Sequence, residues 1–162
     1  MKFIKNIIFI KLSIIFIIFS LDRISKTYVI NLFNETQFNE IYLLEFLNIY
    51  FIWNEGIAFG LFSFENKEIY NLITLIIIII NLVILYILFR LKDIRRIFFL
   101  IILGGSLGNL FDRLFYNAVP DFIDLHLGDL HWFIFNPADI FISIGVICLI
   151  LDEFFFKNKK ND

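Results

Sequence analysis

Cysteine, proline and charge are all scarce in this sequence. There is one cysteine, Cys148, and there are two prolines among 162 residues. One cysteine excludes an intramolecular disulfide and a cysteine-based metal cluster, and its place in an apolar run favours a small buried hydrophobe. Apolar residues make up 60% of the chain and charged residues only 19%. Because soluble domains are about 45–50% apolar, we expect lipid to surround much of this chain.

A signal-peptide cleavage site and a metal-ligand cluster are also lacking. Met1–Lys11 is basic and Leu12–Leu21 is apolar, as in a signal peptide, but no small-residue cleavage site follows. We therefore predict that this segment is retained as a first helix. The two histidines, His126 and His131, lie in one polar segment without other metal ligands nearby. We expect no metal, no other cofactor and no nucleic-acid partner.

Long apolar segments are what the sequence has in abundance. A helix needs about 20 residues to cross a bilayer. The first segment reaches that length if its helix continues to about Tyr28, and the third if it continues to Phe115. We predict a single membrane-embedded domain over residues 1–162, α-helical and polytopic, with four transmembrane helices. The apolar segments are Ile4–Leu21, Ile69–Phe89, Ile97–Leu107 and Pro137–Phe156.

Basic residues cluster at three places that a four-helix topology puts on one side of the membrane. Short loops rich in Lys and Arg stay cytoplasmic, so both termini are predicted to be cytoplasmic and the other two connections to be outside. Ten of the fourteen basic residues follow this pattern: Lys2, Lys5, Lys11, Arg90, Lys92, Arg95, Arg96, Lys157, Lys159 and Lys160.

The two outer connections differ in composition. In the first, Ile41–Trp53 is rich in β-formers, and Tyr50 and Trp53 suit a membrane interface. We predict a small β-rich extracytoplasmic region between the first two helices, around Ile41–Phe62, with Asn54 facing the functional site. The second, Tyr116–Asn136, holds three aspartates, two histidines and no Lys or Arg.

Two glycine-containing segments carry polar residues. Asn54 begins Asn-Glu-Gly-Ile-Ala-Phe-Gly60, which alone indicates only a turn with a shallow surface at Ala58. In the second segment, Gly104 and Gly108 are four residues apart and let another helix approach closely. Three strongly polar residues that follow are expected to share a helix face, with the last two offsetting each other's charge. They are Asn109, Asp112 and Arg113.

Two aspartates are expected near the outer ends of the last two helices. Pro137 suits the first turn of the fourth helix, with Asn136 as its cap and Asp139 in its first turn. Capping alone is a complete structural explanation of Asp139. If Asp121 lies beside it, one carboxylate keeps a proton and the other is ionised. Such a pair can hydrolyse a peptide bond without a metal.

These segments, in this order, resemble lipoprotein signal peptidase, the bacterial type II signal peptidase family. The resemblance covers nearly the full length. It is carried by Asp22 with Lys26, Asn54-x-Gly-x-Ala-Phe, Gly-Asn109-x-x-Asp112-Arg113, Val-x-Asp121-Phe and Phe-Asn136-x-Ala-Asp139.

The resemblance implies an aspartic endopeptidase of the bacterial inner membrane with its site at the outer face. Asp121 and Asp139 would be the catalytic dyad, and Asp22 and Lys26 a structural polar motif. The substrate would be a prolipoprotein signal peptide preceding a diacylglyceryl-modified cysteine, with membrane lipids as further partners. Residues implied to line or support the substrate site are Asn54, Gly56, Gly108, Asn109, Asp112, Arg113, Asn136 and Ala138.

Two other classes of protein remain open from the residues alone. A small transporter or channel subunit would explain intramembrane polar residues, but it predicts them through the whole bilayer depth, whereas here the charges gather near one face. A non-catalytic assembly or lipid-binding subunit would explain the glycines but has no need of paired aspartates. An intramembrane protease of the presenilin or prepilin-peptidase type would be expected to show Gly-x-Gly-Asp, which Gly104–Asn109 does not supply.

Overall fold

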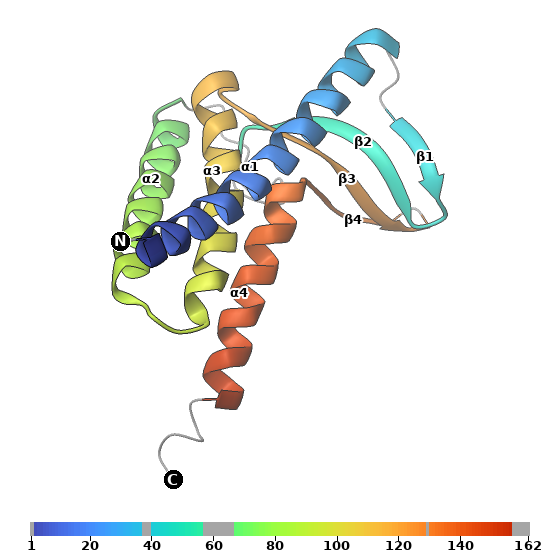
Figure 1. The fold of residues 1–162 in the computed structure, drawn as a ribbon. Helices are drawn as coiled ribbons and strands as arrows, with labels where there is room; N and C mark the ends of the chain where they lie inside the picture. The colour runs from blue at the N-terminus through green and yellow to red at the C-terminus, as the bar shows by residue number, and fades with distance from the viewer. Residues whose placement is uncertain (1, 37–39, 57–66, 129, 157–162) are drawn as a thin grey trace.

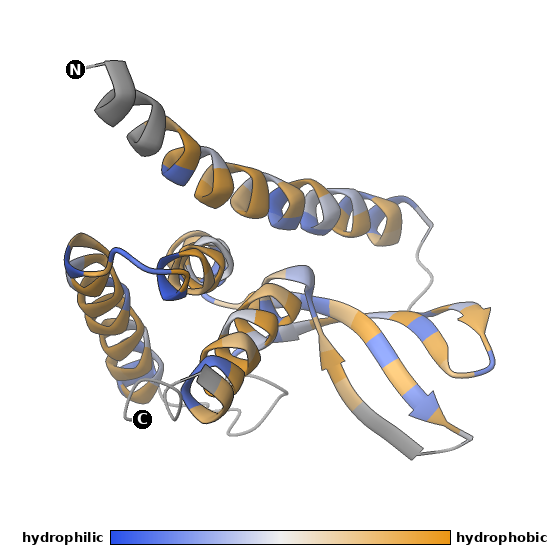
Figure 2. Ribbon diagram, turned by 60° about the horizontal axis from the view of Figure 1, so that its bottom comes forward, coloured by the Kyte–Doolittle hydropathy of each residue, from blue (hydrophilic) through white to orange (hydrophobic). Residues whose placement is uncertain are grey.

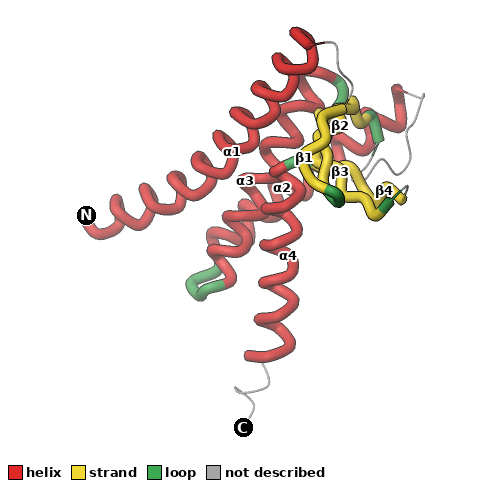
Figure 3. Tube along the Cα trace, turned by 90° about the vertical axis from the view of Figure 1, so that its right-hand side faces the viewer, coloured by secondary structure: helices red, strands yellow, loops and turns green. Residues whose placement is uncertain are grey.

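Helices and one small sheet make up the described part of the chain. The computed structural model describes residues 2–36, 40–56, 67–128 and 130–156. The sheet lies at one end of the molecule, and the α2–α3 connection and the C-terminal end of α4 lie toward the other (Figures 1 and 3). In chain order the elements are α1 (Lys2–Thr36), β1 (Glu40–Leu44), β2 (Leu47–Asn54), α2 (Lys67–Arg90), α3 (Arg95–Tyr116), β3 (Val119–Leu127), β4 (Leu130–Phe135) and α4 (Pro137–Phe156).

The four helices coincide with the apolar segments, but the predicted first helix was too short. The ends of α2, α3 and α4 lie within two residues of the predicted ones. The first helix was predicted to end near Tyr28, but α1 continues to Thr36. Its last two turns are stabilised by tertiary contacts, because Val29 and Phe33 are buried in a cluster with Phe122 of β3. A contact between residues so far apart in sequence leaves no local signal.

The sheet is larger than predicted and draws on both the α1–α2 and the α3–α4 connections. Its strand order is β1-β2-β3-β4, with every neighbouring pair antiparallel. The first two strands confirm the β-rich region between the first two helices, although residues 57–62 lie outside the described residues. The other two strands were not predicted. Strand β3 was missed because its aspartates are typical of loops. Asp121 and Asp124 nevertheless lie in a strand and are buried.

Glycines on α3 and α4 allow the close packing that the sequence predicted. A Cβ on Gly104 would lie 2.9 Å from Cβ of Ile18 on α1. On Gly108 it would lie 2.5 Å from Oδ2 of Asp22, also on α1. On Gly105 it would lie 2.6 Å from the backbone oxygen of Ala138 on α4. The small residues of α3 therefore allow it to pack closely against both α1 and α4.

The outside of the molecule is largely apolar, and its interior holds charged side chains beside apolar ones. Large apolar side chains are exposed on the outer faces of the helices, for example Phe16 on α1, Leu82 on α2 and Phe154 on α4. Figure 2 shows α2 hydrophobic along most of its length, whereas α1 carries hydrophilic positions within its length. Charged residues are buried instead, among them Asp22 and Lys26. This is the inverse of a soluble domain and suits a lipid solvent.

Two described helices are long and apolar enough by themselves to cross a membrane, α2 and α3. Neither α1, from Phe9 onward, nor α4 meets the same measure of composition. Charges interrupt them: Asp22, Arg23 and Lys26 in α1, and Asp139, Asp152 and Glu153 in α4. Length and hydropathy thus support two spans directly, and the predicted four spans remain a hypothesis.

Candidate active site

A cavity of about 250 Å³ opens between the sheet and the helices. Six residues singled out in the sequence line it, supplied by β2, α3, β3, α4 and the residue before α4. The others that line it are Ile77, Ser106, Val119, Ile142 and Ser143, which the sequence gave no reason to select. The six are Asn54, Asn109, Arg113, Asp121, Asn136 and Asp139.

Asp121 enters the cavity from β3. Its Oδ2 accepts a hydrogen bond from Nδ2 of Asn54 (2.7 Å), and its Oδ1 accepts one from Nδ2 of Asn136 (2.6 Å). Neighbouring strands set the first contact, because Asn54 of β2 is in register with Val119 of β3. Burial, and then the nearby charge of Asp139, raise the pKa of Asp121 from 3.8 to about 6.

Asp139 enters from the first turn of α4. Its backbone N–H donates to Oδ1 of Asn136 (3.2 Å), and the backbone N–H of Asn136 donates to Oδ2 of Asp139 (3.2 Å). The predicted cap is therefore confirmed and is reciprocal. The remaining oxygen, Oδ1, accepts from Nδ2 of Asn109 on α3 (2.8 Å). Capping uses only one of the two carboxylate oxygens.

Asn136 links the two aspartates. It donates its side-chain amide to Asp121 and its backbone N–H to Asp139. Both carboxylates line the same cavity, and their direct partners there are amides. We call Asp121 and Asp139 the carboxylate pair.

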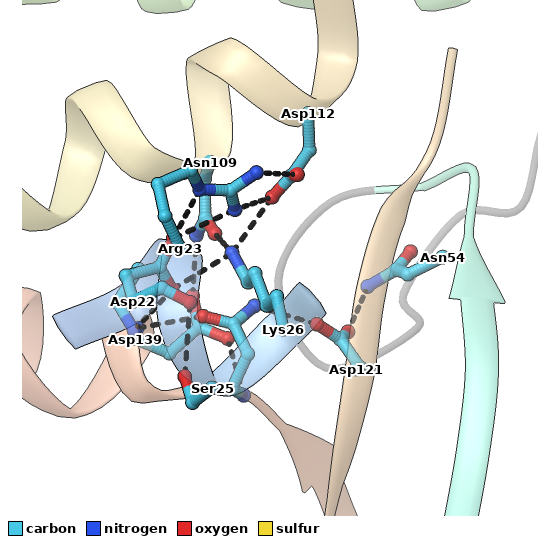
Figure 4. A network of polar contacts seen from close by, with 11 residues as sticks. Asp22, Arg23, Ser25, Lys26, Asn54, Asn109, Asp112, Asp121 and Asp139 are labelled. Carbon is cyan, nitrogen blue, oxygen red and sulfur yellow. Dashed lines mark hydrogen bonds and ion pairs between the residues drawn. The ribbon is translucent and has the colours of Figure 1, made fainter. Parts of the chain in front are cut away.

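A second polar group lies beside the pair, between α1 and α3, and we call it the ionic cluster: Asp22, Arg23, Lys26 and Asp112. Nζ of Lys26 lies 2.9 Å from Oδ1 of Asp22 and 2.7 Å from Oδ2 of Asp112. Arg23 pairs with both carboxylates as well, at 2.8 Å from Oδ2 of Asp22 and 2.6 Å from Oδ2 of Asp112. Figure 4 shows these contacts converging on Asp112.

The ionic cluster also reaches the carboxylate pair. Oδ1 of Asp22 accepts a hydrogen bond from the backbone N–H of Ala138 (3.1 Å), so α1 fixes the first turn of α4. Nζ of Lys26 donates to Oδ1 of Asn109 (2.7 Å), the residue that contacts Asp139. Arg23 was missed in the sequence, although its place beside Asp22 and one turn before Lys26 was a usable signal.

Arg113 lies apart from the ionic cluster, which corrects one expectation. Asp112 and Arg113 were expected to offset each other, but Asp112 pairs with Arg23 and Lys26 across to α1. Adjacent residues on a helix point about 100° apart, so both cannot face α1. Arg113 instead donates to the backbone carbonyl of Gly56.

The turn after β2 holds that carbonyl in place. The backbone N–H of Gly56 donates to Oδ1 of Asn54 (2.8 Å), which leaves Nδ2 of Asn54 for Asp121. Ala58 and Gly60 lie outside the described residues. His126 does not line the cavity, and its Nδ1 lies 3.8 Å from Oδ2 of Asp124. Within the described ranges no cluster of three or more His, Cys, Asp or Glu is arranged to hold a metal ion.

An apolar exterior around a cavity with two buried carboxylates defines a membrane protein with a two-carboxylate site. A family model described as signal peptidase (SPase) II matches residues 14–155. The chain belongs to the signal peptidase II family. Named relatives and a solved membrane enzyme of similar structure confirm its membrane location and its assignment as a lipoprotein-processing protease.

Proteins with similar sequences match nearly the whole chain. A lipoprotein signal peptidase of Pelagibacter ubique (strain HTCC1062) is 50% identical over 154 residues, 95% of this chain and 93% of the relative. One from Aquifex aeolicus (strain VF5) is 41% identical over 159 residues, 96% and 92% of the two chains. A solved bacterial membrane enzyme is similar in structure, with a TM-score of 0.70, 26% identity, and coverage of 94% of this chain and 91% of that one.

Proposed function

We propose that this chain removes the signal peptide from prolipoproteins whose cysteine carries a diacylglyceryl group, cleaving just before that cysteine with water activated by Asp121 and Asp139. The family and its named relatives support the class of reaction. The observation that carries the mechanism is that two buried carboxylates line one cavity and both bind Asn136. Two carboxylates in a low-dielectric site share a proton, which supplies one acid and one base.

Asp139 is the base in this proposal and Asp121 is the acid. Asp139 lies in the first turn of α4, where the helix dipole favours an anion. It also accepts N–H donors from Asn109 and Asn136, which favour the ionised form. Burial and the charge of Asp139 raise the pKa of Asp121 to about 6, so Asp121 is the member of the pair that takes up the shared proton as pH falls toward that value.

In this proposal the two aspartates carry all the proton transfers of hydrolysis, without a metal or a covalent intermediate. Asp139 takes a proton from water as the water oxygen bonds to the scissile carbonyl carbon. Asp121 gives its proton to the carbonyl oxygen. When the tetrahedral intermediate collapses, the carbon–nitrogen bond breaks, the leaving nitrogen receives the proton held by Asp139, and Asp121 recovers its own. The products are a signal-peptide carboxylate and a free amine on the lipidated cysteine.

The surroundings of the cavity suit a lipid-bearing peptide. An apolar groove of about 250 Å³ adjoins Asp139 along α4, lined also by Phe135, Ile140, Ser143, Ile144 and Ile147. In our proposal acyl chains lie in such apolar surroundings while the scissile bond reaches the carboxylate pair.

We further propose that all four helices span the bacterial inner membrane, with both termini in the cytoplasm and the site at the outer face. The basic α2–α3 connection and the C-terminal end of α4 lie toward the end opposite the sheet, which supports this orientation (Figure 1). In a Cys148→Ala background, Glu45→Cys should react with an impermeant thiol reagent in intact cells and Lys92→Cys should not. The reverse pattern would reject the topology.

The mechanism is tested by replacing each aspartate with its amide. Asp121→Asn and Asp139→Asn should each lower the cleavage rate of a diacylglyceryl-modified precursor by about 10²–10⁴ while precursor binding persists. Asp124→Asn is the matched control, since Asp124 is a buried aspartate of the same strand that does not line the cavity. A metal chelator is present throughout. Near-normal cleavage by either amide variant would end the aspartic mechanism, and inhibition by the chelator alone would indicate a metal enzyme.

A further inference from the structure

Lys26 is a fully buried cation that the mechanism above does not use. Its ammonium has three protons, and three oxygens lie within hydrogen-bonding distance of it. Two belong to the carboxylates of Asp22 and Asp112, at 2.9 and 2.7 Å. The third is Oδ1 of Asn109, at 2.7 Å. The charge of Lys26 is offset by carboxylates that Arg23 also contacts, so the ionic cluster has two positive and two negative members.

The third contact has a consequence for Asp139. A side-chain amide presents an oxygen on one side and an N–H₂ group on the other, and a half-turn exchanges them. An ammonium has no acceptor, so Asn109 can face Lys26 only with its oxygen. Its N–H₂ group is then directed at Oδ1 of Asp139, where the hydrogen bond of 2.8 Å is found. With the opposite orientation, the amide oxygen would face a carboxylate oxygen.

We propose that Lys26 is a positioning residue for the reaction, which holds the Asn109 amide in the orientation that donates to Asp139. This inference rests on the proposed function, and it goes beyond the structural role that the sequence suggested for Lys26. The path runs from α1 through α3 to α4, along Lys26, Asn109 and Asp139. These contacts are drawn in Figure 4, which labels all three residues.

Charge acts in the same direction as orientation. Lys26 contacts the carboxylates of Asp22 on α1 and Asp112 on α3, and its charge also acts on Asp121 of β3 and Asp139 of α4. The other cations of these elements are Arg23, which pairs with the same two carboxylates, and Arg113, which donates to the carbonyl of Gly56. Burial raises the pKa of Asp121 and the positive charge of Lys26 opposes that rise. Loss of this cation should therefore make the carboxylate pair harder to ionise, and the acidic limb of the rate profile should move to higher pH.

Arg23 offers a matched control within the same cluster. It pairs with the same two carboxylates as Lys26, and its described hydrogen bonds go to these carboxylates and not to Asn109. Lys26→Met and Arg23→Met each remove one cation from the cluster, so both should lower the unfolding temperature. Only Lys26→Met should change the chemistry.

The experiment measures kcat and KM from pH 4 to 9 for a diacylglyceryl-modified precursor, together with the unfolding temperature. Lys26→Met should lower kcat about tenfold to hundredfold and move the acidic limb up by about one pH unit, whereas Arg23→Met should stay within about twofold of wild type. Equal losses in the two variants, or an unmoved limb in Lys26→Met, would overturn the inference. Wild-type enzyme that fails to cleave the precursor would instead reject the proposed function, and the inference with it.

A double-mutant cycle keeps the test valid if Lys26→Met folds poorly. Asn109→Ala leaves all four charges of the cluster in place and should reproduce the loss of kcat. Adding Lys26→Gln to Asn109→Ala should then cause little further loss of kcat on the plateau above the acidic limb, because there both changes act through one hydrogen bond. Additive losses would show that Lys26 does not act through Asn109 and would overturn the inference.

Discussion

The ionic cluster and the carboxylate pair are neighbours inside one apolar protein, but their charges are offset in different ways. Each carboxylate of the ionic cluster contacts both cations. The carboxylates of the pair receive amide donors instead, from Asn54, Asn109 and Asn136. A cation beside each carboxylate would hold both ionised, whereas amide donors leave one proton free to move. The first arrangement suits stability and the second suits acid–base chemistry.

The largest expected difference is in stability. Asp112→Asn should lower the free energy of unfolding by about 3–5 kcal/mol, because it leaves Arg23 and Lys26 buried with one carboxylate in place of two. Asp121→Asn should cost less than about 1 kcal/mol, since it also removes a carboxylate that burial disfavours. Denaturant titration in detergent measures both. Equal costs would mean that the two regions do not differ in the way argued here.

The second test uses pH. The pKa of Asp121 is raised in the folded state to about 6, above its ordinary value of 3.8. The folded chain therefore holds this proton more tightly, and the stabilisation is fully present below about pH 4 and is lost as pH rises through 6. The loss from this residue is at most about 3 kcal/mol. Comparing unfolding at pH 4 and pH 7 should show a smaller change in Asp121→Asn than in wild type, and an unchanged slope would contradict the assignment.

Much of this comparison could be predicted from the sequence, and some of it could not. The helices follow from apolar length, and the cap by Asn136 follows from local spacing, because both depend on residues close together in the chain. The pairing of Asp112 with Arg23 and Lys26 could not be derived, since it depends on which face of α3 meets α1. Strand β3 was missed for a related reason: its aspartates look like loop residues until the neighbouring strands and helices α1 and α3 cover them.

Gly108 tests the boundary between the two regions. A Cβ there would lie 2.5 Å from Oδ2 of Asp22, whose other oxygen accepts the N–H of Ala138. Gly108→Ala should therefore push α1 away from α3 and cost about 2 kcal/mol of unfolding free energy, with a fall in kcat as the first turn of α4 shifts. Gly128→Asn is the control, because a Cβ on Gly128 meets nothing within 4 Å and asparagine tolerates its positive φ. If Gly108→Ala changed neither the free energy of unfolding nor kcat, the Asp22 side chain would have to move aside at no cost.

The smallest effects concern two arginines, Arg23 in the ionic cluster and Arg113 in the lining of the cavity that holds the carboxylate pair. Arg23 contacts both carboxylates of the ionic cluster, and its guanidinium lies 4.9 Å from the centre of the Phe111 ring. Lysine keeps the charge but loses the planar fork, so Arg23→Lys should cost about 1 kcal/mol of stability and leave KM unchanged.

Arg113→Lys should show the opposite pattern. Nη2 of Arg113 donates to the carbonyl of Gly56, a bond that a lysine can also make. Its Nη1 is buried and has no hydrogen-bond partner within the described ranges, and the residue lines the cavity. A substrate carbonyl can accept a hydrogen bond from this Nη1. Loss of that hydrogen bond should raise KM a few-fold, which corresponds to about 1 kcal/mol, with little change in the free energy of unfolding. Arginine stays charged at any working pH, which excludes it as the proton donor. Full activity in a folded Arg113→Lys variant would mean that this arginine only braces the Gly56 turn, and that substrate is oriented by amides alone.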